Sequence, residues 1–186
     1  METLAEPPEV LEQFATGELG AFETLFRQFQ GEVYGWIVRI VRDPGAAEDL
    51  TLETFWRIYR AHARFDPTRS FGAWARRIAT NVALDHLKSA PVAREFKEEN
   101  QFAGTASAAA APNPGVQREI RERTERAFRQ LPPRLQVVAT LALIEERPHT
   151  EIAEALNIST AAVKSRLFRA VRLLRKKLRN LGVDYE

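Results

Sequence analysis

Cysteine is absent from the 186-residue sequence, which excludes a disulfide framework and any metal site built on thiolates. Histidine is scarce. Its three residues, His62, His86 and His149, stand far apart, and none forms a pair at the spacing of metal ligands. We interpret them as surface or packing residues, and we expect neither a metal site nor a cofactor.

Long apolar runs and strand patterns are missing as well. No run reaches about 18 apolar residues, and the acidic start METLAEPPEVLEQ lacks the apolar segment of a signal peptide. We therefore expect a soluble, cytoplasmic protein with no membrane contact. The sequence contains no alternating β-branched run and no Asn-Gly or Asp-Gly hairpin dipeptide. With 45% apolar and 28% charged residues, it predicts an all-α protein with true hydrophobic cores.

Charge is small in sum but uneven along the chain. The formal net charge is +2, yet residues 1–90 hold ten basic against thirteen acidic residues, a net of −3. Residues 118–186 hold fifteen basic against nine acidic residues, a net of +6. From Lys164 to Arg179 there are eight basic residues and no acidic one. The C-terminal half therefore favours binding to a polyanion, whereas the N-terminal half does not.

The N-terminal half shows apolar residues at helical spacing. A long stripe from Phe22 to Ile40 ends at Asp43-Pro44-Gly45, and a second helix is expected over about residues 46–63. Ser70 is suited to cap a third helix. These three helices predict one small domain over residues 1–90.

The composition changes after this domain. Residues 91–115 contain GTASAAAAPNPG and few large apolar side chains, which is typical of a flexible linker. Four further helices are expected, at about residues 116–130, 134–145, 150–156 and 160–179. The sequence thus predicts a second small helical domain over residues 116–186.

The third helix of the first domain, SFGAWARRIATNVALDHLK, has two different faces. Phe71, Ala75, Ile78 and Val82 recur at helical spacing and predict a core stripe. A second line mixes an aromatic ring, two cations and an amide, which suits neither a core nor a plain surface: Trp74, Arg77, Asn81 and Lys88.

The stretch TEIAEALNISTAAVKSRLFRAVRLLRKKL predicts a helix-turn-helix. Asn157 can adopt the left-handed conformation that ends a short helix, and Ser159 or Thr160 can cap the next. The side chains that face away from the buried stripe of the second helix are Lys164, Ser165, Phe168, Arg169 and Arg172.

This exposed face matches the position that enters the major groove of DNA. Lys164 and Arg169 can reach guanine, and Ser165 suits a base edge or a phosphate. Basic residues further along, from Arg175 to Arg179, are expected on the DNA backbone. The alternative is a solvated cationic face on an ordinary bundle helix.

Taken in order, three segments resemble extracytoplasmic-function (ECF) sigma factors of bacterial RNA polymerase. They are AEDLTLETFWRIYRAHARFDP, the two-faced helix, and LPPRLQVVATLALIEERPHTEIAEALNISTAAVKSRLFRAVRLLRKKL. The similarity covers about Phe14 to Leu181. It implies a sigma region 2-like domain that docks on the clamp helices of the polymerase beta-prime subunit and opens the −10 element. It also implies a sigma region 4-like domain that reads the −35 element and touches the beta flap.

The resemblance assigns roles to particular residues. Polymerase docking falls on the second helix, at Asp49, Leu50, Glu53, Phe55 and Trp56. Single-stranded −10 DNA falls on Trp74, Arg77, Asn81 and Lys88, with Asn81 holding a base turned out of the stack. The −35 contacts fall on the face already described. Core packing explains Leu50, Phe55 and Trp74 equally well at this stage.

Two features depart from the family pattern. Leu52 stands where many members carry Gln, and ERPHTEIA replaces the usual entry to the helix-turn-helix. The resemblance also suggests regulation by an anti-sigma factor, although nothing in the sequence identifies one.

Two other classes of function are a DNA-binding regulator and an enzyme. A helix-turn-helix repressor or activator that binds duplex DNA alone would explain the C-terminal half, but it leaves Trp74, Arg77 and Asn81 without a role. An enzyme is disfavoured because the sequence shows no metal-ligand cluster, phosphate loop or nucleophile–base pair.

Overall fold

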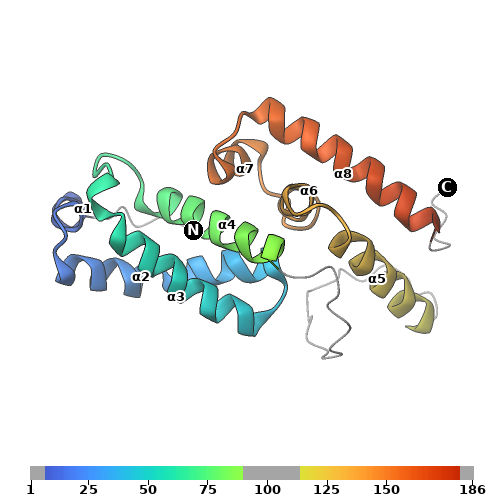
Figure 1. Cartoon of the computed structure of the whole chain (residues 1–186), viewed down its shortest axis with the longest axis horizontal. Helices are drawn as coiled ribbons and strands as arrows, with labels where there is room; N and C mark the ends of the chain where they lie inside the picture. The colour runs from blue at the N-terminus through green and yellow to red at the C-terminus, as the bar shows by residue number, and fades with distance from the viewer. Residues whose placement is uncertain (1–6, 90–113, 181–186) are drawn as a thin grey trace.

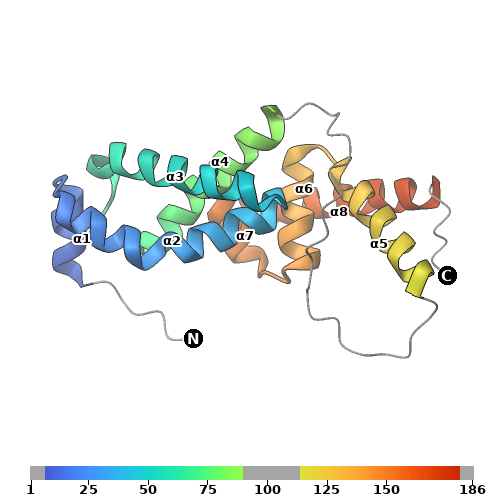
Figure 2. The ribbon, with the colours of Figure 1, turned by 90° about the horizontal axis from the view of Figure 1, so that it is seen from below.

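The computed structural model describes residues 7–89 and 114–180. Within these ranges the chain forms helices and no strand, which confirms the all-α prediction (Figures 1 and 2). The elements are α1 (Pro8–Ala15), α2 (Leu19–Val41), α3 (Pro44–Arg60), the 3₁₀ turn η1 (His62–Arg64), α4 (Phe71–Ser89), α5 (Pro114–Arg129), α6 (Pro133–Ala139), the π-helix η2 (Thr140–Ile144), α7 (His149–Leu156) and α8 (Thr160–Asn180).

Local chemistry sets the helix boundaries of the N-terminal group, α1–α4. Helix α2 ends at Arg42, which adopts a left-handed conformation with φ of 55°. Asp43 caps α3, because its Oδ1 accepts a hydrogen bond from Ala46 N at 3.0 Å. Ser70 caps α4 as predicted, accepting from Ala73 N at 3.3 Å. These caps satisfy backbone N–H groups that the first turn of each helix leaves unpaired.

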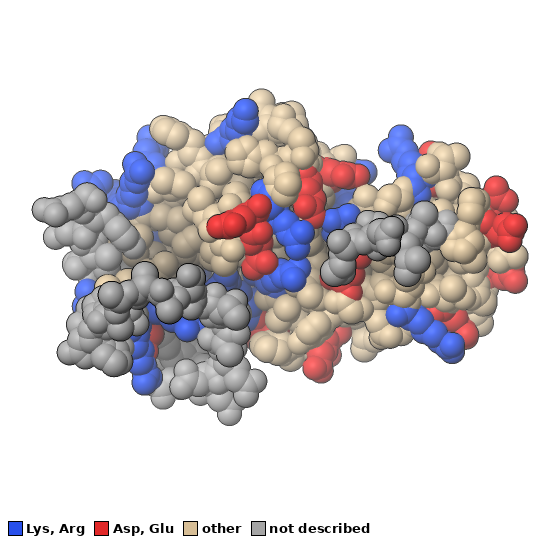
Figure 3. All heavy atoms as spheres, turned by 180° about the vertical axis from the view of Figure 1, so that it is seen from behind, with Lys and Arg blue, Asp and Glu red and all other residues tan. Residues whose placement is uncertain are grey.

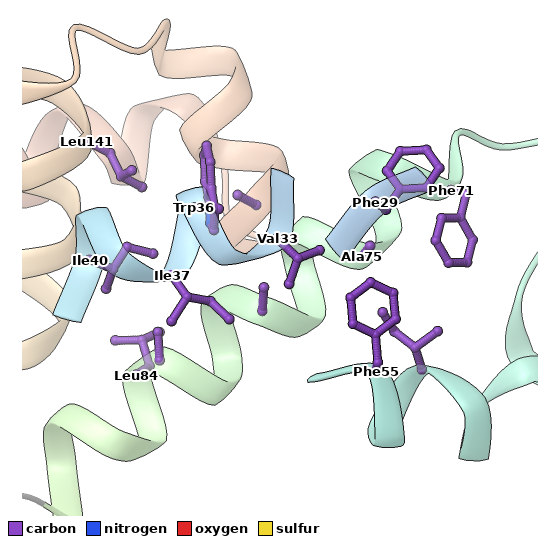
Figure 4. Packing of buried hydrophobic residues seen from close by; sticks show 14 of the residues in the cluster. Phe29, Val33, Trp36, Ile37, Ile40, Phe55, Phe71, Ala75, Leu84 and Leu141 are labelled. Carbon is purple, nitrogen blue, oxygen red and sulfur yellow. The ribbon is translucent and has the colours of Figure 1, made fainter. Parts of the chain in front are cut away.

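The stripes predicted for α2 and α4 form the core of this group (Figure 4). On α4, Phe71, Ala75 and Val82 are at most 1% exposed, and Ile78 is half-buried at the edge. Their partners on α2 and α3 are also buried: Leu25, Phe29, Val33, Ile37, Ile40, Phe55 and Ile58.

In the C-terminal group, α5–α8, helices α7 and α8 form the predicted helix-turn-helix. Asn157 ends α7 with φ of 51° and ψ of 50°, the left-handed conformation expected of it. Ile158 N donates to Ala153 O at 2.9 Å, which closes the corner. Ser159 then caps α8, accepting from Ala162 N at 3.1 Å. The buried stripe of α8 consists of Val163, Ala170, Leu174 and Leu178, with Leu167 half-buried beside it.

Two elements differ from the sequence prediction. Helix α1 has no counterpart in the sequence prediction; it packs on the core, with the ring of Phe14 5.4 Å from that of Phe71. Helix α6 continues as the π-helix η2, in which Glu145 N donates to Thr140 O at 3.1 Å. The predicted linker, residues 91–115, lies almost wholly outside the described residues, and α5 begins at Pro114.

The two helix groups lie side by side and share one buried cluster. Figures 1 and 2 show α1 at one end and α5 with the last turns of α8 at the other, and α4, α6 and α7 lie between them. Helix α4 contacts α6 and α7, and α2 contacts η2. The apolar core therefore runs without interruption from α2 and α4 into Leu141 and Ile152.

Candidate functional site

Helix α8 presents the predicted duplex-binding face to solvent. Lys164, Ser165, Arg169 and Arg172 are all exposed, and Phe168 is 70% exposed. The helix orients this face because its opposite stripe is buried against α6 and α7. An exposed aromatic ring among cations has the chemistry that a nucleic-acid surface can use, because the ring offers an apolar contact and the cations offer phosphate contacts.

Positive charge is concentrated around this face. Burial, followed by the nearby guanidinium groups of Arg134 and Arg169, lowers the pKa of Arg166. Arg169 reaches back toward Ser165, with Nη2 3.5 Å from its Oγ, a long contact that is easily exchanged for a base or phosphate. Figure 3 shows basic side chains along the upper left edge, where α8 runs, with no acidic ones between them in that view.

On α4 the predicted single-strand face is also exposed. Arg77 and Asn81 lie one helical turn apart, and neither side chain has a hydrogen bond or ion pair with another described residue. The opposite side of α4 carries the buried stripe, so packing fixes the direction in which this face points. An amide and a guanidinium held at the surface can bind a base edge and a phosphate.

Trp74 has a mixed position. It is half-buried, and its ring centroid lies 5.0 Å from that of Phe65 and 6.1 Å from that of Phe14. The indole is thus part of an aromatic cluster, and only a portion of it reaches the surface. Only that portion is available for the predicted stacking with a base, and the remainder packs against Phe14 and Phe65.

Lys88, the last residue of the predicted single-strand face, is exposed but held by an ion pair. Its Nζ lies 3.1 Å from Asp85 Oδ1, and Asp85 Oδ2 lies 3.3 Å from Arg57 Nη1 on α3. Burial raises the pKa of Asp85, but hydrogen bonds from Lys88 and Arg57 outweigh it, so that this pKa lies below its ordinary value. Arg57 Nε in turn lies 2.8 Å from Glu53 Oε1. Because the side chains are about half exposed, each pair contributes at most about 1 kcal/mol.

The predicted docking residues of α3 separate into surface and core. Asp49 is exposed, Trp56 is 56% exposed, and Leu50 and Glu53 are half-buried. Phe55 is only 2% exposed and packs against Phe26 with ring centroids 4.7 Å apart. The ring of Phe55 is enclosed by α2 in this conformation and packs beneath the exposed residues of α3, and its contact with polymerase stays a prediction.

Sequence reasoning missed part of this apolar surface. Leu52 is 63% exposed, one turn before Trp56 on the same face of α3. On α2, Leu19 is 57% exposed, and Phe22 and Phe26 line a shallow hollow beside α3. For Leu52, its departure from the family pattern was the feature of the sequence that could have indicated this surface. For the hollow, the sequence offered no such feature, because the helical spacing of Phe22 and Phe26 assigns both residues to the core.

Other kinds of site find no support in the described part of the chain. No group of three His, Asp or Glu side chains there could hold a metal ion. None of the described helices combines the length and the apolar character needed to cross a bilayer.

Comparison with known proteins agrees with this arrangement. The family model of Sigma-70 region 2 matches residues 25–91, and that of Sigma-70 region 4 matches residues 121–174. The RNA polymerase sigma-H factor of Pseudomonas aeruginosa is 30% identical, covering 97% of this chain and 98% of the relative. The RNA polymerase sigma factor CarQ of Myxococcus xanthus is 31% identical, covering 94% and 98%. The ECF RNA polymerase sigma factor SigW of Bacillus subtilis is 29% identical, covering 92% and 96%.

A solved structure has the same fold. CnrH, in complex with the cytosolic domain of CnrY, matches with a TM-score of 0.59 at 22% identity, over 93% of this chain and 97% of that one. The two region models occur in the predicted order, and relatives of at least 30% identity are matched over nearly their whole length. The chain therefore belongs to the ECF sigma factors of the sigma-70 family.

Proposed function

We propose that this chain is an alternative sigma factor that binds core RNA polymerase, recognises −35 and −10 elements and promotes DNA opening. One observation carries the assignment of its sites: three chemically different faces lie on three helices. Helix α8 presents cations around Phe168, α4 presents Arg77 and Asn81, and α3 presents acids around Leu52 and Trp56. A repressor needs only the first of these faces.

The chemistry of each face fits its partner. On α8, basic side chains can bind guanine edges and phosphates in the major groove. On α4, Asn81 can hold an unstacked base while Arg77 binds the strand backbone. On α3, carboxylates surround exposed apolar side chains, which suits a basic helical surface such as the clamp helices of beta-prime. The function is binding and positioning in the cytoplasm, without catalysis.

The first test is copurification with bacterial core RNA polymerase, followed by run-off transcription from a pooled promoter library. Transcripts that require this chain, together with a shared −35 and −10 sequence among the selected promoters, would support the proposal. Tight binding to a duplex by the chain alone, without association with core, would favour the repressor instead. Regulation by an anti-sigma factor stays a prediction of the family resemblance.

A further inference from the structure

The predicted single-strand face of α4 contains an acidic residue. The face runs from Arg77 through Asn81 to Lys88, and Asp85 fills the turn between the last two, four residues after Asn81. Four residues advance about 6 Å along a helix and return to nearly the same side, so Asp85 lies beside Asn81 on this face. Its side chain is 53% exposed. A carboxyl group therefore stands among the residues that are expected to bind the −10 strand.

Two cations hold the carboxyl group of Asp85 in place. Lys88 Nζ lies 3.1 Å from Oδ1, and Arg57 Nη1, on the neighbouring helix α3, lies 3.3 Å from Oδ2. Burial opposes ionisation, but the hydrogen bonds from Lys88 and Arg57 outweigh it and keep the pKa of Asp85 below its ordinary value. The group is therefore a carboxylate at neutral pH and can only accept hydrogen bonds. Because a carboxylate has about four acceptor sites, about two remain for a ligand.

The charges around this carboxylate permit DNA to approach it. A negative group on a surface that binds a polyanion is costly unless cations offset it. Arg77 lies on the same face, and Arg57 and Lys88 contact the carboxylate itself. These cations outnumber the two acids, Asp85 and Glu53, the second of which shares Arg57. The ammonium group of Lys88 has three donors and gives one to Asp85, so it can still bind a phosphate.

We propose that Asp85 is a specificity-determining residue for the −10 strand: it accepts a hydrogen bond from the amino group of the base next to the one held by Asn81, and it disfavours thymine there. The inference rests on the proposed function. Adenine, cytosine and guanine each carry an exocyclic amino group that a carboxylate can bind. Thymine has carbonyl oxygens on both sides of its single N–H, and these repel a carboxylate. Arg57 is a positioning residue, because it acts through the direction in which it holds Asp85.

The test measures base preference instead of overall affinity. A promoter from the library supplies single-stranded −10 oligonucleotides in which each position carries each of the four bases in turn, and their binding to the holoenzyme is followed by fluorescence anisotropy. At one position we expect the wild type to prefer a base with an amino group over thymine by about fivefold or more. Asp85→Ala should reduce this ratio to below about twofold and leave the ratios at the other positions unchanged.

Two further variants separate recognition from charge. Removing the carboxylate also frees Lys88 for phosphate, but this strengthens the binding of every strand alike and cancels in the ratio. Arg57→Gln should lower the same ratio in part, because Asp85 keeps its charge and loses its fixed orientation. Glu12→Gln is the charge-matched control: Glu12 is exposed on α1 and belongs to none of the proposed faces, so every ratio should stay that of the wild type.

A change in the DNA provides an independent check on the contact. At the position found, the preferred base is replaced by its analogue without the amino group: purine for adenine, hypoxanthine for guanine or 2-pyrimidinone for cytosine. The wild type should lose about fivefold or more in affinity. Asp85→Ala should bind the base and its analogue equally, because the partner of the amino group has already been removed.

Several results would overturn the proposal. They are the absence of such a preference at every position, its persistence in Asp85→Ala, its loss in Glu12→Gln, and an equal loss of discrimination at all positions in Asp85→Ala. The last result would show that the ion pairs of Asp85 only hold α3 and α4 together. If the wild-type holoenzyme binds no −10 oligonucleotide and yields no promoter-specific transcript, the proposed function itself has failed, and this inference with it.

Discussion

Phe168→Ala provides the sharpest test of the face on α8, because the structure separates its effect on stability from its effect on binding. The side chain is 70% exposed and belongs to neither buried cluster. Truncation of an exposed residue away from special features changes the free energy of unfolding by less than about 0.5 kcal/mol. We therefore expect the thermal unfolding midpoint of the variant to match that of the wild type.

The expected loss of binding follows from the same exposure. A phenylalanine buries about 200 Å² when enclosed, so about 140 Å² of this ring remains for DNA to cover. At about 25 cal/mol per Å² this sets an upper limit of about 3.5 kcal/mol. Part of the area stays wet in a groove, so we expect a loss of about 1–2 kcal/mol, or about 5–30-fold in affinity.

The assay is competition between promoter duplexes for the holoenzyme, using a promoter isolated from the library. Replacing single thymines of the −35 element by uracil removes the methyl group that an aromatic side chain contacts. One such replacement should weaken binding by the wild type and leave the variant unaffected. Leu143→Ala is the matched control, since Leu143 is 44% exposed in the same helix group but lies on η2. Equal promoter affinity of Phe168→Ala and wild type would refute the placement of the ring in the groove.

Three further changes test other parts of the structure. Asn81→Ala, at an exposed position, should leave binding to core polymerase unchanged and impair opening of the −10 element; undiminished permanganate reactivity of the melted thymines would contradict the role. Asp85→Asn should release Lys88 and strengthen binding to single-stranded −10 DNA about twofold to fivefold at low salt, measured by fluorescence anisotropy with the holoenzyme. The pKa of Asp85 is lowered in the folded chain, so the Asp85 carboxylate stabilises the fold at a pH above its unfolded-state pKa, and this stabilisation is lost as the pH falls through its folded-state pKa. Asp85→Asn should therefore make the free energy of unfolding fall less steeply with decreasing pH in the acid range. Thr80→Val leaves Nε1 of buried Trp36 without its acceptor and should cost about 1–3 kcal/mol in urea unfolding, and an unchanged midpoint would show that the hydrogen bond is replaceable.

Local sequence determined most of the helices, because the residues that begin and end a helix act on backbone groups only a few positions away. The caps at Ser70 and Ser159 and the left-handed Asn157 depend on side chains and backbone within a few residues. The exposed face of α8 followed from the same logic, since a buried stripe at helical spacing leaves the intervening cations outside. The family motifs added the roles of the faces, which periodicity alone does not supply.

Only the tertiary structure decided the remaining points, because they depend on residues distant in sequence. Phe55 and Leu52 lie on one helix, yet α2 covers the first and leaves the second in solvent. Trp74 is half-buried because Phe14, from a helix that the sequence did not predict, packs against it. The linker composition permitted the two domains to be separate or in contact. In the structure the two helix groups are in contact: Arg76 and Arg147 flank the ring of Trp36, and Arg39 and Arg76 form ion pairs with Glu145 and Glu151. These pairs join residues that are far apart in the sequence, so no local pattern predicts them.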